Sequence, residues 1–135
     1  MRRVLIVSPH PPSRVLLARM LAEPGLVLQA VADGDEAFAA MAVQLPALVI
    51  VDLRRPGEDD PLFLGLLRRR QPRLPVISLL PGRLRVTEGV QERVEEVGAS
   101  SPDELRQLLS ALQQALHDVL STSLLRILRP PVGQA

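Results

Sequence analysis

Short apolar runs alternate along the chain with segments in which leucine and alanine recur every three or four residues. The runs are rich in β-branched residues and too short for helices, which is typical of strands buried on both faces. They lie at Val4–Val7, Leu26–Val31, Ala47–Val51 and Leu74–Leu80. The helical segments between them predict a doubly wound α/β fold around a parallel sheet. The positions expected to be buried in that sheet are Ile6, Val49, Val51 and Ile77.

The segment 83–100 follows no single period. Its valines recur at helical spacing, at Val86, Val90, Val94 and Val97. The fold, however, needs both a helix and a fifth strand in this window. One interpretation is a short, poor helix near Leu84–Gln91 and a strand near Arg93–Ala99, whose acidic residues suit a sheet edge. The alternative makes Thr87–Val97 one helix and removes the fifth strand.

A long helix is predicted at the end of the chain. Ser101 is a helix cap, Pro102 fits the first turn, and Asp103 favours the positive end of the helix dipole. The apolar pattern continues to Leu128, so the helix would have roughly 27 residues and a length of about 40 Å. We therefore predict an α/β domain over residues 1–116, an extension of the last helix over 117–128 and a disordered tail over 129–135.

The extension of this helix is the predicted interaction surface. Its apolar positions are Leu116, Val119, Leu120, Leu124, Ile127 and Leu128. Apolar surface beyond the reach of the sheet marks interaction sites, and a symmetric homodimer is the commonest outcome. The alternative is that Ser121–Ser123 breaks the helix and its last turn folds back on the same domain.

Composition excludes several classes of function. The 135 residues contain no Cys, no Lys and only two His, so thiolate metal sites and lysine-dependent mechanisms are excluded. The formal charge of +1 gives no basic field for nucleic acid, and the near absence of aromatic residues leaves no platform for stacked bases. No apolar run has the length of a membrane span, and we expect a cytoplasmic protein without a membrane contact.

One acidic residue stands where open α/β sheets place their sites. Asp52 ends the apolar run at Ala47–Val51 and is followed by a turn containing Pro56 and Gly57. The alternative interpretation is that Asp52 is a solvated cap in an ordinary strand-to-helix turn. The first strand-to-helix turn has neither the spaced glycines of a dinucleotide site nor a Walker-type loop, which disfavours nucleotide enzymes.

Four segments together carry a resemblance to the receiver domain of bacterial response regulators, over roughly Met1 to Leu116. They read VLIVSPHPPSR, DLRRPGEDD, LPVISLL and SPDELRQLL, in the order and spacing of that family. The resemblance implies a five-stranded parallel sheet in the order 2-1-3-4-5, flanked by five helices. In this chain the fourth helix would be degenerate and the last one extended. The resemblance also puts Asp52 at the phosphorylated aspartate.

The chain departs from the family at the other signalling positions. Receivers carry an acidic pair after the first strand, and here Ser8 and Pro9 stand there. The hydroxyl of Ser8 and the pyrrolidine ring of Pro9 do not supply the anionic oxygens that Mg²⁺ demands, so no Mg²⁺ and no other cofactor is expected. Leu80 replaces the switch Ser/Thr, the family's Lys is missing, and no aromatic residue lies on the predicted fifth strand.

These departures favour a degenerate receiver, which is not an enzyme and acts as a phosphorylation-independent interaction or dimerisation module. Two hypotheses remain beside it. Asp52 could still be phosphorylated by a histidine kinase through an unusual metal-free route, or the fold could serve only to display the last helix. A DNA-binding regulator is disfavoured because no basic patch or recognition helix follows. The sequence does not name the partner or the pathway.

Overall fold

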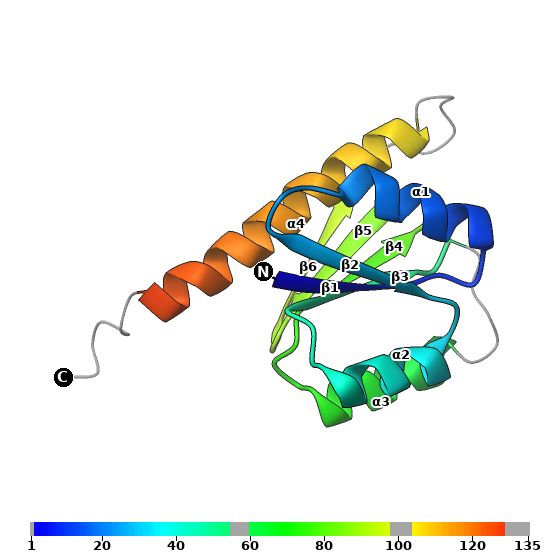
Figure 1. Cartoon of the computed structure of the whole chain (residues 1–135). Helices are drawn as coiled ribbons and strands as arrows, with labels where there is room; N and C mark the ends of the chain where they lie inside the picture. The colour runs from blue at the N-terminus through cyan, green and yellow to red at the C-terminus, as the bar shows by residue number, and fades with distance from the viewer. Residues whose placement is uncertain (1, 55–59, 98–103, 129–135) are drawn as a thin grey trace.

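The computed structural model describes residues 2–54, 60–97 and 104–128 (Figure 1). The described side chains of the last helix are those of residues 106–121. In chain order the elements are β1 (Arg2–Val7), α1 (Pro11–Leu21), β2 (Leu26–Val31), α2 (Gly34–Val43), β3 (Leu48–Asp52), α3 (Asp60–Arg70), β4 (Val76–Leu80), β5 (Arg83–Glu88), β6 (Gln91–Glu96) and α4 (Glu104–Leu128).

The strands form one six-stranded sheet in the order β2-β1-β3-β4-β5-β6. The first four strands pair in parallel, with Ile6 beside Ile50 and Ile50 beside Ile77. The α/β fold and the order 2-1-3-4 of these strands are confirmed. The last two strands differ from the prediction, because β5 runs antiparallel to β4 and β6 antiparallel to β5.

The interpretation of 83–100 as helix plus strand is therefore wrong at Leu84–Gln91, and the single helix over Thr87–Val97 is wrong as well. A two-residue turn joins β5 to β6, and Gly89 in it has a φ of 61°. Only glycine adopts that conformation without strain, which favours a hairpin. Leu84 and Val86 are buried while Arg83 and Arg85 are not, so the period that counts here is two.

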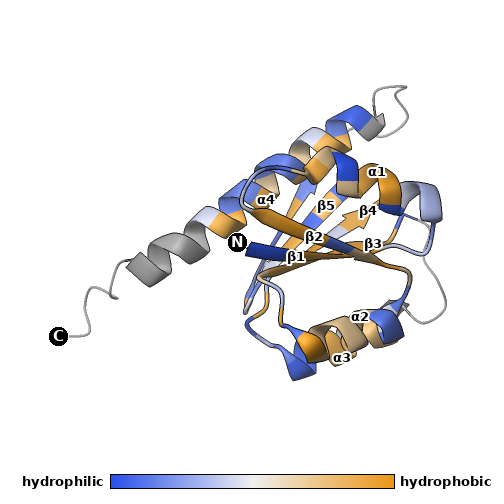
Figure 2. Ribbon diagram, in the orientation of Figure 1, coloured by the Kyte–Doolittle hydropathy of each residue, from blue (hydrophilic) through white to orange (hydrophobic). Residues whose placement is uncertain are grey.

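Helices cover both faces of the sheet. α1 and α4 lie on one face, and α2 and α3 lie on the other (Figure 1). The ribbon of the parallel strands is coloured largely as hydrophobic (Figure 2), and their apolar residues belong to two core clusters. The four residues predicted to be buried, Ile6, Val49, Val51 and Ile77, have exposures between 0% and 2%. They divide between the two core clusters, one on each face of the sheet.

α4 is continuous through Ser121–Ser123 and extends to Leu128, as the long-helix prediction required. Its apolar seam packs on the sheet of its own domain over more residues than predicted, as far as Leu120. Leu116, Val119 and Leu120 are at most 7% exposed and belong to the core, so their assignment to an exposed interaction surface is wrong. The Arg2 guanidinium also donates a hydrogen bond to the Leu120 carbonyl.

The core thus continues past residue 116, where we placed the end of the domain. The helix then runs on beyond the sheet, with its C-terminal turns directed away from the domain (Figure 1). The predicted contacts of Leu124, Ile127 and Leu128, and the tail 129–135, lie outside the described side chains and residues. No helix in the described ranges combines the length and the hydropathy of a membrane span.

Candidate functional site around Asp52

The site lies at the carboxyl ends of two neighbouring parallel strands. Asp52 is the last residue of β3, and Ser8 directly follows β1. Because β1 and β3 pair in parallel, both side chains reach the same edge of the sheet. Ser8 is fully buried and Asp52 is 5% exposed. The alternative interpretation of Asp52 as a solvated cap is therefore wrong.

The Asp52 carboxylate is bound on both oxygens by Arg54. The guanidinium donates from Nε to Oδ1 and from Nη2 to Oδ2, each over 2.9 Å, and the Arg54 amide adds a bond of 3.2 Å to Oδ1. The Ser8 hydroxyl donates to Oδ2 over 2.9 Å. A two-pronged guanidinium contact of this kind is among the stronger pairings available to a carboxylate. Arg54 is therefore a direct partner of Asp52 and not a solvated turn residue.

A second layer of polar contacts connects this pair to α1. Arg54 Nη2 also donates to Ser13 Oγ over 3.1 Å, and His10 Nδ1 lies 2.9 Å from the same oxygen. Arg14 donates to the Ser8 carbonyl oxygen over 2.7 Å. His10 therefore lies three contacts away from Asp52, with Ser13 and Arg54 between them. The start of α1 and the end of β3 are joined through one guanidinium.

These contacts determine the charge of Asp52. Burial alone would raise the pKa of the carboxyl, but the hydrogen bonds and the positive charge of Arg54, with the Ser8 hydroxyl, outweigh it. The net effect holds the pKa of Asp52 below its ordinary value of 3.8. The residue is a carboxylate at neutral pH, and its counter-ion is supplied by the same chain.

The residues at this edge do not fit Mg²⁺. Mg²⁺ demands octahedral oxygen ligands and is usually held by carboxylates. Ser8 offers a neutral hydroxyl, Pro9 offers no side-chain donor, and Arg54 occupies both oxygens of Asp52. Within the described residues no three His, Cys, Asp or Glu side chains gather as a metal site would require.

The predicted site residues are brought together only in part. Asp52 and Ser8 are in contact, whereas Leu80 packs with the apolar cluster under α2 and α3 and brings no hydroxyl to the site. Sequence reasoning missed Arg54 and Ser13 as site residues. One signal was available: a cation stands two positions after a strand-ending acid in a chain whose other metal ligands are replaced.

Comparison with known proteins identifies the family of this chain. The family described as the response regulator receiver domain matches residues 4–100, which is most of the chain. The chain belongs to the response regulator receiver family. The matched region includes Ser8, Asp52 and Leu80.

Two relatives illustrate the reach of the similarity. The DNA-binding transcriptional regulator NtrC of Salmonella typhimurium is 36% identical over 76 residues, which cover 56% of this chain and 16% of that protein. The transcriptional regulatory protein TcrA of Mycobacterium tuberculosis is 36% identical over 88 residues, covering 65% of this chain and 34% of TcrA. The chain thus matches only a minor part of these longer regulators.

Solved structures show the same fold. The apo receiver domain of nitrogen regulatory protein C aligns with a TM-score of 0.50 at 35% identity, covering 57% of this chain and 62% of that one. The receiver domain of the Francisella response regulator 1452 aligns with a TM-score of 0.63 over 91% of this chain and 99% of that one. Its identity of 15% makes that likeness one of fold alone.

Proposed function

We propose that this chain is a degenerate receiver that signals through protein contacts and not through phosphorylation of Asp52. The observation that carries the proposal is the two-pronged contact of Arg54 with the Asp52 carboxylate. A phosphoryl acceptor needs a free carboxylate oxygen as the nucleophile. Here each oxygen accepts at least two hydrogen bonds, and the side chain is nearly fully buried.

The chemistry of transfer supports the same proposal. Phosphoryl transfer depends on positioning and on neutralising the charge that develops on the phosphoryl oxygens. In this chain the acidic pair of the family is replaced by Ser8 and Pro9, and the family's Lys is missing because the chain contains none. Arg54 remains as a cation, but its charge is already used by Asp52.

A small-molecule phosphodonor tests the proposal directly. The protein is incubated with acetyl phosphate and Mg²⁺, and its intact mass is measured beside that of Asp52→Asn. We expect no phosphoryl adduct in either protein. A stable adduct in the wild type that is missing from Asp52→Asn would contradict the proposal and favour phosphorylation by a histidine kinase.

The loss of the metal site can be tested in the same protein. Titration of Mg²⁺ while following the amide signals of Ser8, Asp52 and Leu53 should give no saturable shift. A matched variant, Ser8→Asp with Pro9→Asp and Arg54→Ala, returns the carboxylates and removes the guanidinium. We expect this variant to gain saturable shifts at millimolar Mg²⁺. Shifts of that kind in the wild type would contradict the proposal.

The protein contact of the proposed module includes the end of α4. With Leu116, Val119 and Leu120 assigned to the core, the surface retains the apolar sequence positions Leu124, Ile127 and Leu128. We propose that they pack on a helix of a second copy or of a partner protein. The test compares the full chain with a chain ending at Ser121, which keeps the buried residues of α4. Unchanged association after this truncation would remove α4 from the interface.

A further inference from the structure

The outer strand of the hairpin, β6, is the most exposed regular element of the sheet. It lies at the sheet edge beside β5, and all six of its residues are exposed. Natural edge strands are usually short, bulged, covered or charged because an open edge pairs with other strands. β6 has six residues in regular register with β5 along its whole length. The edge is therefore long and regular enough to pair with another strand.

The register shows which backbone groups of β6 face outward. The Val97 amide donates to the Gly82 carbonyl over 2.8 Å, so these two residues form a hydrogen-bonded pair of the antiparallel ladder. Hydrogen-bonded pairs alternate with non-bonded pairs in such a ladder. The hydrogen-bonded pairs recur at every second residue, so the N–H and C=O groups of Glu95 and Arg93 point toward β5. The N–H and C=O groups of Glu92, Val94 and Glu96 therefore point away from the sheet.

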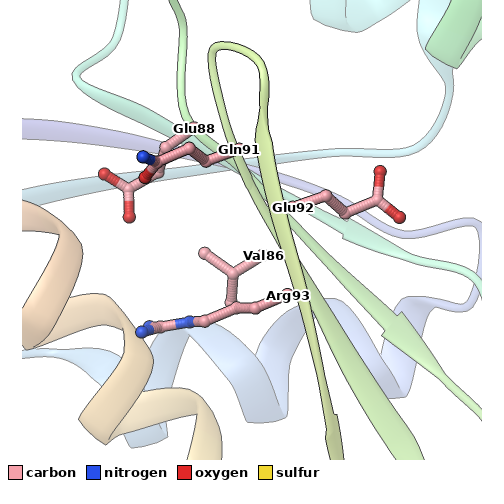
Figure 3. Close-up of a pocket in the computed structure, with 5 residues that line it drawn as sticks. All are labelled: Val86, Glu88, Gln91, Glu92 and Arg93. Carbon is pink, nitrogen blue, oxygen red and sulfur yellow. The ribbon is translucent and has the colours of Figure 1, made fainter.

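The side chains of β6 form a pattern that is complementary to itself. Figure 3 shows Arg93 and Val86 on one side of the hairpin, where they line a hollow of about 330 Å³, and Glu92 on the other side. Two β6 strands can pair antiparallel through these outward groups in only a few registers. In the register centred on Val94, Val94 of one copy lies beside Val94 of the other. Arg93 of each copy then lies beside Glu95 of the other, which gives two such pairs.

We propose that β6 is a self-association edge, on which a second copy of this chain pairs antiparallel about Val94. The two neighbouring registers would place Arg93 beside Arg93 or Glu95 beside Glu95, and like charges directly opposite destabilise a strand pair. The Val94 register has an apolar pair at the two-fold axis and two complementary charge pairs beside it. It joins the two six-stranded sheets into one.

The repulsive pairing in this register, which the two-fold axis also produces twice, is moderated by arginines of the same domain. Glu92 would face Glu96 of the second copy. Glu92 already accepts a hydrogen bond from Arg68 over 3.0 Å and lies 3.4 Å from Arg85, and Arg83 is the cross-strand neighbour of Glu96. Arg68 and Arg85 lie on the α3 face of the hairpin, where they line a groove of about 510 Å³ together with Glu92. Their charge reduces the repulsion between the two glutamates.

This interface is separate from the one proposed for α4. The phosphodonor experiment tests the loss of phosphorylation, the truncation at Ser121 tests the helix, and neither changes β6. If β6 supplies the homodimer, the end of α4 is left for a different partner. The two surfaces are therefore tested one at a time.

The first test is Val94→Pro, measured by sedimentation equilibrium of the full chain. Proline is tolerated on an edge strand where its N–H would face solvent, so the hairpin should keep its fold while the outward donor at the centre is lost. We expect the wild type to dimerise at about 100 µM and the variant to associate at least about tenfold more weakly. Circular dichroism before and after the substitution checks the fold.

The second test uses charge exchange and does not depend on proline. Arg93→Glu alone and Glu95→Arg alone each place like charges together twice and should weaken the dimer about tenfold. The double variant R93E/E95R restores opposite pairs with unchanged net charge and should return the association to within about threefold of the wild type. Rescue of this kind is not expected if the two residues act only within their own domain.

Three outcomes would overturn the proposal. One is a wild-type chain that stays monomeric at about 500 µM, which would show that the charges of β6 protect the edge. Another is a dimer that survives Val94→Pro. The third is a dimer weakened by both single charge variants and not restored by the double one, which would show that Arg93 and Glu95 do not pair across the two-fold axis.

Discussion

The central strand β3 and the outer strand β6 belong to the same sheet but differ in how far their residues are buried. All five residues of β3 are buried, because helices cover both faces of the parallel strands. All six residues of β6 are exposed. Between them β5 has one buried face, with Leu84 and Val86 under α4, and one more polar face. The degree of cover, and not strand propensity, determines which residue types each strand carries.

The difference follows from the connections. A parallel pair needs a crossover, which is usually a helix and which then covers a face of the sheet. The hairpin of β5 and β6 needs only a two-residue turn, so this connection itself adds no helix to cover its α3 side. That face carries Arg83, Arg85 and Thr87 on β5, with Glu92 and Val94 on β6. Polar residues suit a face without a helix above it.

Truncation of buried side chains should show the largest difference in unfolding free energy between covered and uncovered faces of the sheet. Leu5→Ala and Ile50→Ala, on opposite faces of the parallel half, should each lower the free energy of unfolding by about 2–5 kcal/mol. Leu84→Ala in β5 should cost a similar amount, whereas Arg85→Ala should cost less than about 1 kcal/mol. Urea unfolding measures all four. Equal losses at Leu84 and Arg85 would mean that both faces of the hairpin are covered.

Removal of the counter-ion at the end of β3 should have the next largest effect. Arg54→Ala leaves a buried carboxylate with only Ser8 and a backbone amide, and we expect a loss of roughly 2–3 kcal/mol, reduced from a fully buried pair because Arg54 is 24% exposed. The pair R54A/D52N should recover part of this loss in the same urea assay. A neutral effect of Arg54→Ala would show that the ion pair is not structural.

The turn of the hairpin offers a smaller effect. Gly89 has a φ of 61°, and the space around its Cα is open, so Gly89→Ala tests backbone conformation without a clash. We expect a loss of about 1 kcal/mol, measured by thermal unfolding. Gly65→Ala in α3, also in open space and without positive φ, is the control and should not destabilise. Equal effects at both positions would contradict the role of the turn.

The smallest expected effect is a difference in the pH dependence of stability between the wild type and Arg54→Ala, which tests the charge of Asp52 at the end of β3. In the wild type the folded pKa of Asp52 lies below the unfolded value, so its stabilisation is present above about pH 4 and is lost as pH falls through the folded pKa. In Arg54→Ala burial is no longer outweighed, the folded pKa rises, and this contribution reverses sign. Urea unfolding between about pH 3 and pH 6 compares the two proteins. Parallel pH profiles would contradict the assignment.

The parallel half could be read from the sequence because each of its signals is local. Four apolar runs, the helix starts between them and Asp52 at the end of one run predicted the elements, the fold class and the buried residues correctly. The hairpin was missed because its valines, at Val86, Val90 and Val94, also fit a helix. Only the pairing of β5 with β4 shows that Val86 is buried while Val90 at the turn is fully exposed.

The sequence by itself determined which residues stand at the predicted signalling positions, since the identities of Ser8, Pro9 and Leu80 and the lack of lysine do not depend on the tertiary arrangement. The partner of Asp52 was decided only by the tertiary structure. The tertiary structure also decided that Leu116, Val119 and Leu120 are buried in their own domain. The sequence pattern does not show this, because a heptad seam is the same whether a helix packs on a sheet or on another helix. Periodicity indicates which face of an element is apolar. What covers that face depends on contacts between residues far apart in the chain, such as Arg2 with Leu120.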